Sequence, residues 1–113
     1  MRLSHLHVAV KAYEDAVSWF ERVLQVTTVS KDDGAFVFRA GDVEIVVHPD
    51  WGDGDTSMTI ALVSDDCERD HAALVARGAL SRKAPHRKDG SINAVVAGPG
   101  RIAIELEQRL TRA

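Results

Sequence analysis

The stretch Arg101-Ile-Ala-Ile-Glu-Leu-Glu107 decides which fold this chain can adopt. Its two isoleucines and its leucine alternate with small or charged residues. A period of two predicts a strand with one face on a hydrophobic core. The opposite face of that strand carries Glu105, so the function of the chain depends on what else lies beside this carboxylate.

The composition is that of a single globular domain. The chain has 113 residues, of which 45% are hydrophobic and 27% are charged, with a formal net charge of -3 and a pI near 5.9. Nucleic-acid binding usually leaves a basic footprint, which is absent here. No apolar run approaches the roughly 18 residues needed to cross a bilayer. The single cysteine, Cys67, cannot form an intrachain disulfide, so we expect a cytoplasmic protein.

The first half of the chain alternates between strand and helix patterns. We expect strands at residues 3–10, 25–30, 35–40 and 43–48, with turns at Asp32-Asp33-Gly34 and Gly41-Asp42. Between the first two strands, apolar residues recur at helical spacing and predict an amphipathic helix with Trp19 in the core. This apolar stripe consists of Ala16, Trp19, Phe20, Val23 and Leu24.

The second half follows the same plan after a linker at residues 49–57, which has no periodicity. We expect a strand at 58–63, a helix capped by Asp65 or Asp66 and ended by Gly78, and strands at 80–83, 91–97 and 101–107. The predicted buried stripe of this helix is Cys67, His71, Leu74 and Val75. A basic run is interpreted as a solvated loop or, alternatively, as a group that attracts an anionic substrate such as a thioester, phosphate or carboxylate. It consists of Arg82, Lys83, His86, Arg87 and Lys88.

The two halves are an internal repeat. Asp33-Gly34 recurs 56 positions later as Asp89-Gly90, and Ala40-Gly41 recurs 57 positions later as Ala97-Gly98. We therefore predict an α+β fold in one domain, residues 1–113, built from two βαβββ modules. Module one is 1–48 and module two is 58–113. Each helix covers one sheet face, and the other faces should curl into a half-open barrel around a shared cleft.

The residues expected in this cleft combine imidazoles with carboxylates. They are His5, His7, Glu44, Val46, His48, Thr59, Ala61, Ala103 and Glu105. Imidazole and carboxylate groups that converge can bind a divalent metal, and a carboxylate can also act as a general base.

The sequence resembles the vicinal oxygen chelate superfamily, which includes glyoxalase I, bleomycin-resistance proteins and extradiol dioxygenases. The resemblance rests on Ser4-His-Leu-His-Val-Ala-Val10, Ala16-Val-Ser-Trp-Phe-Glu-Arg-Val-Leu24, Thr59-Ile-Ala-Leu62 and Gly100-Arg-Ile-Ala-Ile-Glu-Leu-Glu107. It covers nearly the whole chain. It implies the glyoxalase/bleomycin-resistance/dioxygenase type of fold, and a homodimer, because members of the family commonly build the cleft from two subunits.

The resemblance also implies a set of metal ligands, taken from the first and last strands of each module. His5 and Glu105 match two of these positions. Thr59 falls where metal-dependent members usually have histidine, so one ligand is missing. The remaining ligand position lies in the last strand of module one. Aligning Val43-Glu44-Ile45 with Ile104-Glu105-Leu106 assigns it to Glu44, whereas counting back from Trp51-Gly52 assigns it to Val46. His7 and His48 lie on the same faces and are alternative ligands.

Two functions follow from these residues. The first, which the sequence favours by a narrow margin, is a glyoxalase-like lyase or isomerase that acts on a small substrate with adjacent oxygens. It would use a divalent ion (Ni, Zn, Mn, Co or Fe) bound by His5, Glu44 and Glu105, with a carboxylate of Glu105 or Glu44 as catalytic base. The substrate pocket would be lined by His7, His48, Thr59 and Trp51. The alternative is a metal-free protein that binds a small molecule, as bleomycin-resistance proteins do.

Overall fold

The computed structural model describes residues 4–50 and 57–110. The chain divides into two compact units, one formed by residues 1–57 with 99–101 and the other by 58–98 with 102–113. Each unit contains one four-stranded sheet and one helical segment. No helix in the described residues is long and apolar enough to cross a lipid bilayer.

The first unit contains a mixed sheet with the strand order β1-β4-β3-β2. Its strands are β1 (His5–Val10), β2 (Thr27–Lys31), β3 (Phe36–Ala40) and β4 (Val43–Pro49). The first and fourth strands are parallel, and the other pairs are antiparallel. Helix α1 (Tyr13–Trp19) runs into a π-helical turn, η1 (Phe20–Leu24). This turn ends at Gln25, whose φ of 57° lies in the left-handed region.

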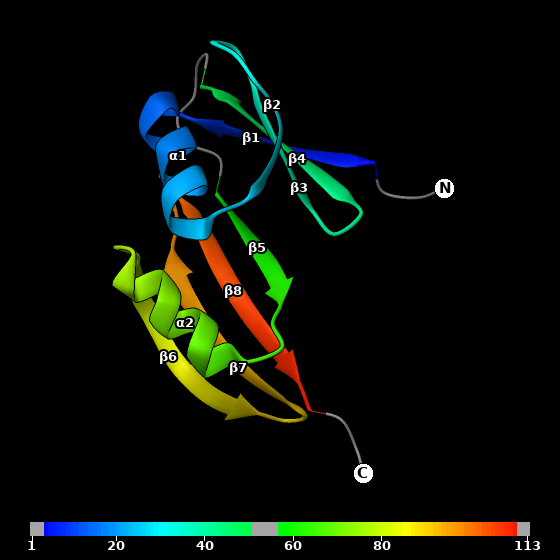
Figure 1. Ribbon diagram of the computed structural model, residues 1–113, viewed down its shortest axis with the longest axis vertical. Helices are drawn as coiled ribbons and strands as arrows, with labels where there is room; N and C mark the ends of the chain where they lie inside the picture. The colour runs from blue at the N-terminus through cyan, green and yellow to red at the C-terminus, as the bar shows by residue number, and fades with distance from the viewer. Residues whose placement is uncertain (1–3, 51–56, 111–113) are drawn as a thin grey trace. The chain divides into compact units, whose positions relative to one another are not determined.

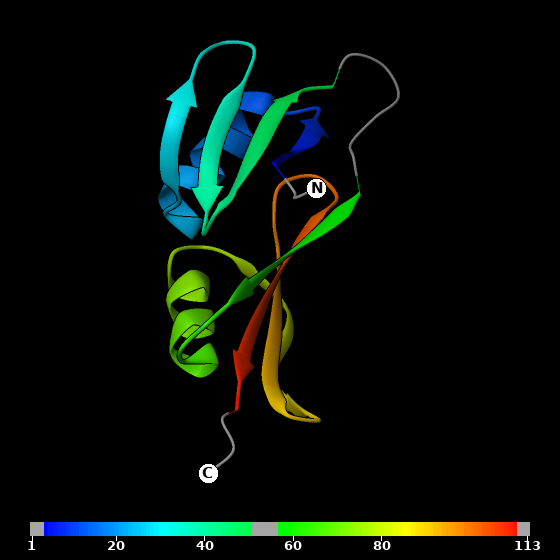
Figure 2. The ribbon, with the colours of Figure 1, turned by 90° about the vertical axis from the view of Figure 1, so that its right-hand side faces the viewer.

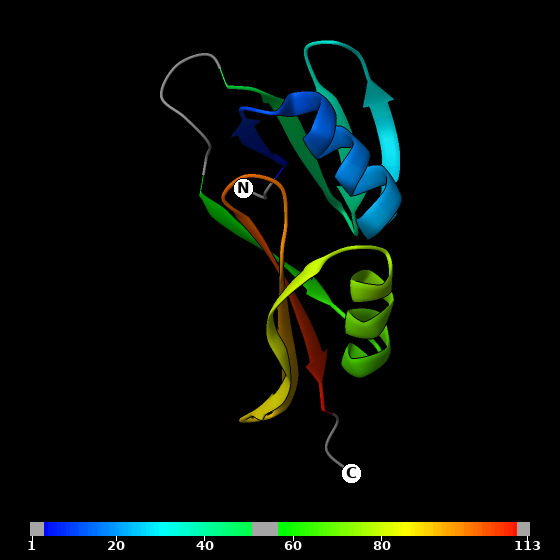
Figure 3. The same ribbon diagram turned by 90° about the vertical axis from the view of Figure 1, so that its left-hand side faces the viewer.

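One face of this sheet packs on the helical segment, as the views from opposite sides in Figure 2 and Figure 3 show. Three aromatic rings form the centre of this core. The ring centroid of Phe20 lies 4.8 Å from that of Phe38, which lies 5.8 Å from that of Phe36. All three side chains are at most 1% exposed. Aromatic rings bury large apolar areas, so this cluster is a major source of the unit's stability.

The second unit repeats this topology with the strand order β5-β8-β7-β6. Its strands are β5 (Met58–Val63), β6 (Leu80–Lys88), β7 (Ser91–Ala97) and β8 (Ile102–Arg109). The first and last of these strands are parallel. Helix α2 (Cys67–Ala76) contacts β6, β7 and β8 and lies on one side of them, as Figure 1 shows. The buried side chains beneath it include Ile104, Leu106 and Val96.

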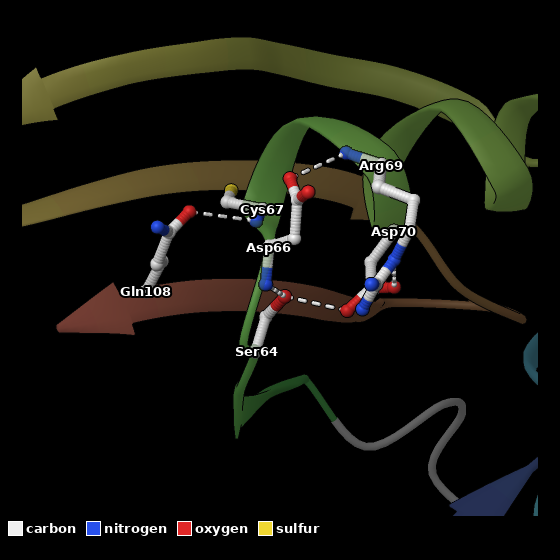
Figure 4. Close-up of polar contacts among 6 residues, drawn as sticks. All are labelled: Ser64, Asp66, Cys67, Arg69, Asp70 and Gln108. Carbon is white, nitrogen blue, oxygen red and sulfur yellow. Dashed lines mark hydrogen bonds and ion pairs between the residues drawn. The ribbon is translucent and has the colours of Figure 1, made fainter.

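Side-chain hydrogen bonds fix the start of α2 to the sheet (Figure 4). Asp66 caps the helix, because its Oδ1 accepts a hydrogen bond of 3.0 Å from the backbone N–H of Arg69. The buried hydroxyl of Ser64 donates to Asp70 and accepts from the backbone N–H of Asp66. The backbone N–H of Cys67 donates over 2.9 Å to Oε1 of Gln108 on β8.

The structure confirms the predicted fold class and the repeated βαβββ modules. The final strand buries Ile102, Ile104 and Leu106, as its alternation predicts. Asp66, rather than Asp65, is the helix cap. The enclosure of one cleft by both sheets stays a prediction, as do the domain boundaries.

Several local predictions are wrong. The predicted strand at 80–83 extends to Lys88, so the basic run lies in β6 and not in a loop. β4 extends one residue beyond its predicted end, to Pro49. Trp19 and Leu24 are only partly buried. The other members of the predicted stripe, Ala16, Phe20 and Val23, are buried, together with Val17. His71 is also only partly buried, where its Nε2 lies 2.8 Å from Oγ of Ser81. Val75 is 41% exposed.

Candidate functional site

Each sheet has one face that its helix does not cover, which we call the open face of that unit. In the first unit, the β4 residues that alternate with the buried Ile45 and Val47 lie on the open face. They are Glu44, Val46 and His48. Cross-strand partners share a face of a sheet, so the register extends this set to neighbouring strands. The open face of the first unit therefore presents His5, His7, Ala9, Val37, Arg39, Glu44, Val46 and His48.

Three imidazoles lie close together on this open face. The ring centroids of His5 and His7 are 4.8 Å apart in an edge-to-face arrangement, and those of His7 and His48 are 5.7 Å apart. Nδ1 of His48 lies 3.1 Å from the carbonyl oxygen of Pro49, to which it can donate. Beside the rings, His7 pairs in register with Val46, and Val46 with Val37. The face thus combines flat rings, which present π surfaces and hydrogen-bonding edges, with a half-buried apolar patch.

Glu44 is held by an arginine on the neighbouring strand. His5 and Glu44 are direct partners in the parallel register, as the proposed metal site requires. However, Oε2 of Glu44 forms an ion pair of 3.2 Å with Nη2 of Arg39, its partner on β3. Both side chains are more than one third exposed, so this pair contributes little to stability. Its consequence is electrostatic, because the guanidinium competes with any cation for the carboxylate.

Neither unit by itself groups the donors of the metal site that the family resemblance implies. Across residues 4–50 and 57–110, no three His, Cys, Asp or Glu side chains within a unit are grouped to hold a metal ion. Glu44 has an arginine partner, and Thr59 offers a hydroxyl where an imidazole is needed. Catalytic zinc sites usually have three protein ligands. No chemical step is therefore assigned to a metal.

The open face of the second unit carries Glu105. The register places Ala61, Glu105, Val95 and Lys83 side by side on four successive strands, and we call this set the Glu105 row. In the part of the chain that the structure describes, the side chains of Glu105 and Lys83 have no hydrogen-bond or ion-pair partner. Thr59 lies on the same face, opposite Ala103 in the neighbouring register position.

A groove of about 610 Å³ lies elsewhere on the first unit, beside α1 and the turn after β2. It is lined by Tyr13, Glu14, Val17, Ser18, Glu21, Lys31, Asp32 and Asp33. Burial, and secondarily the carboxylates of Asp32 and Asp33, raises the pKa of Tyr13, whose hydroxyl donates to the carbonyl oxygen of Asp32. Glu21 pairs with Lys31, and Oδ1 of Asp32 accepts two backbone hydrogen bonds within its turn. Because most of these polar groups already bind one another, we assign the groove a structural role.

The structure thus brings His5, His7, Glu44 and His48 together on one face, and places Thr59 and Glu105 on the open face of the other unit. The position of Trp51 lies outside the described residues. Sequence reasoning missed Arg39, the partner of Glu44. It placed Lys83 in a basic run but missed that Lys83 shares a row with Glu105. The alternation in Phe36-Val-Phe-Arg39 indicates that Arg39 and Val37 share a face, but only the register shows that Arg39 meets Glu44.

Residues 2–106 match the family model described as the Glyoxalase/Bleomycin resistance protein/Dioxygenase superfamily, and the chain belongs to this family. No curated protein has a significant sequence match to the chain.

Solved structures share the fold at low sequence identity. The antibiotic-binding protein TnmS3 from Streptomyces sp. CB03234 is 19% identical, with a TM-score of 0.83 over 96% of each chain. TioX from Micromonospora sp. ML1 is 15% identical, with a TM-score of 0.82 over 97% of this chain and 100% of that one. A glyoxalase/bleomycin resistance protein/dioxygenase from Nocardioides is 15% identical, with a TM-score of 0.82 over 100% of this chain and 86% of that one. At these identities the likeness shows the fold alone.

Proposed function

We propose that this chain binds a small organic molecule on the open faces of its sheets, without a metal ion. The observation that carries the proposal is the Arg39–Glu44 ion pair, which gives the carboxylate in register with His5 a cationic partner from the chain itself. The remaining residues of that face are imidazoles and valines, which suit stacking and hydrogen bonding of a flat ligand. A relative of the same fold, TnmS3, is described as an antibiotic-binding protein, which supports this class of function.

The second candidate function is a metal-dependent lyase or isomerase. His5 and Glu105 favour it, because they occupy two of the positions where metal-dependent members of the family have ligands. Thr59 and the Arg39–Glu44 pair weaken it. Under this alternative Arg39 would have to release Glu44, or the imidazoles of His7 and His48 would have to supply the missing donors.

Elemental analysis separates the two candidates. The protein is purified without an affinity tag, incubated with nickel, zinc, manganese or cobalt, and desalted before the metal is measured. The binding-protein proposal predicts far less than one ion per chain. One ion per chain that is lost in both His5→Ala and Glu105→Ala would overturn it in favour of the enzyme. Arg39→Gln is the informative companion variant, because any weak metal affinity should rise once Glu44 loses its partner.

We also infer a cytoplasmic homodimer. The resemblance to a family that often assembles in pairs supports the dimer, and the lone, fully buried Cys67 suits a reducing compartment. Sedimentation equilibrium over a range of protein concentrations tests the assembly. A mass that stays at 12.3 kDa at every concentration would contradict the dimer.

A further inference from the structure

The open face of the second unit carries opposite charges on two separate strands. The carboxylates of Glu105 and Glu107 lie on β8, and the cationic side chain of Lys83 lies on the edge strand β6. The strand between them, β7, places Val95 and Asn93 on this face. Because α2 covers the other side of these three strands, this is the face that the unit's own helix leaves open (Figure 1).

The Glu105 row is one part of this face that has unused charges of both signs. Glu107 already forms an ion pair of 2.8 Å with Arg109. Among the described residues, by contrast, the side chains of Glu105 and Lys83 make no hydrogen bond or ion pair. Val95 separates them, in register with Glu105 on one side and Lys83 on the other. Neighbouring strands lie about 4.8 Å apart, so the backbones that carry the two charges are roughly 10 Å apart.

We propose that this row binds an elongated zwitterion, with a protonated amine at Glu105, a carboxylate or phosphate at Lys83 and an apolar segment over Val95. The proposal rests on the proposed function and names the chemical class of its ligand. Its basis is charge complementarity. A molecule with one charge would leave either the carboxylate or the ammonium unpaired, whereas a zwitterion of matching length pairs both and covers the valine. The partial burial of Glu105 strengthens its attraction for an amine relative to a fully solvated carboxylate.

The edge position of β6 fits this role. Two irregularities in the pairing with β7, between Ser81 and Lys83 and between Lys83 and His86, flank Lys83. Bulges of this kind redirect side chains and are common next to binding sites. Arg87 lies on the same strand but pairs with Ile92, which shares the face of buried Ala94 and Val96 on β7. It is therefore on the opposite side of the sheet and provides a matched control.

The probe is 8-aminooctanoate, whose extended length is roughly the span between the two strands. Its binding is compared with that of octylamine and octanoate, which keep the chain but have one charge each. Chemical shifts of the Val95 methyl groups report the site. We expect 8-aminooctanoate to bind roughly tenfold more tightly than either single-charge analogue at low salt. This advantage should vanish in Glu105→Lys and in Lys83→Glu, persist in Arg87→Glu, and return when Glu105→Lys and Lys83→Glu are combined.

The combined variant guards against misfolding of the single ones, because it keeps both charges and reverses only their positions. Equal binding of the three probes, or an equal loss in Arg87→Glu, would overturn the zwitterion proposal. A parallel screen of flat, uncharged antibiotics keeps the two proposals distinguishable. If those compounds bind and 8-aminooctanoate shows no advantage, only the ligand class is wrong. If no compound binds, the proposed function fails as well.

Discussion

The hydrogen bond between the backbone N–H of Cys67 and Oε1 of Gln108 can be removed by a single substitution, which tests its contribution to the stability of the fold. It joins the first turn of α2 to β8, the strand that carries Glu105. The substitution Gln108→Met removes the acceptor while keeping the length of the side chain. The matched variant Gln108→Glu keeps an oxygen acceptor at the same place.

The magnitude follows from the burial of Cys67, which is 0% exposed. A buried N–H group that loses its acceptor cannot form a replacement hydrogen bond with water. We therefore expect Gln108→Met to lower the free energy of unfolding by about 1–3 kcal/mol. In Gln108→Glu the acceptor remains, and a negative charge near a helix N-terminus is favourable by about 0.3–1 kcal/mol. The nearby carboxylates of Asp66 and Asp70 offset that gain, so this variant should stay within about 1 kcal/mol of the wild type.

Urea denaturation followed by circular dichroism measures these free energies, and hydrogen exchange measured by NMR reports the Cys67 amide directly. The amide should exchange faster in Gln108→Met than in Gln108→Glu. If Gln108→Met is as stable as the wild type, or if both variants lose the same stability, the hydrogen bond does not contribute as described.

Three further predictions concern the core, the ion pair and the buried thiol. Phe38→Ala should lower the free energy of unfolding by about 3–5 kcal/mol, because it opens a cavity among buried aromatic rings. Val29→Ala is the control, at a position that is 44% exposed, and it should change the free energy of unfolding by less than about 0.5 kcal/mol. A double-mutant cycle of Arg39→Gln and Glu44→Gln on the free energy of unfolding should give a coupling energy below about 1 kcal/mol, which high salt removes. A larger coupling energy that persists in high salt would contradict the solvent-exposed geometry of the ion pair. Burial, with a smaller effect of neighbouring carboxylates, raises the pKa of Cys67 above 9.0, so the folded state holds this proton more tightly than the unfolded chain. The stability that the thiol contributes is present below that pH and is lost as the pH rises through the folded pKa; urea titrations at increasing pH should show this loss in the wild type and a shallower decline in Cys67→Ala.

The sequence predicts best the elements that have one buried and one open face. Ile102, Ile104 and Leu106 are all buried, and their alternation with polar or small residues is evident in the sequence. Edge strand β6 has no such period, because nearly all of its residues are exposed and two irregularities interrupt its pairing. Its basic residues therefore suggested a loop.

For the candidate site, the sequence pattern predicted which face a residue lies on but not which residues are neighbours across strands. Alternation was sufficient to place His5, Glu44 and Glu105 on faces away from the cores. It could not show that Arg39 is the direct neighbour of Glu44, or that Lys83 shares a row with Glu105, because both facts depend on how strands pair. Register is set by turns and by packing along the whole sheet, so local sequence periodicity does not reveal it.

The most direct test of the account is a ligand-observed NMR screen of protein that has been treated with a chelator and dialysed. The panel contains flat aromatic antibiotics and zwitterions, and each hit is measured again after a divalent metal is added. The account predicts hits in the absence of metal, weakened by His7→Ala or Glu105→Gln and unchanged by the metal. Binding that appears only when a divalent metal is present would contradict metal-free ligand binding.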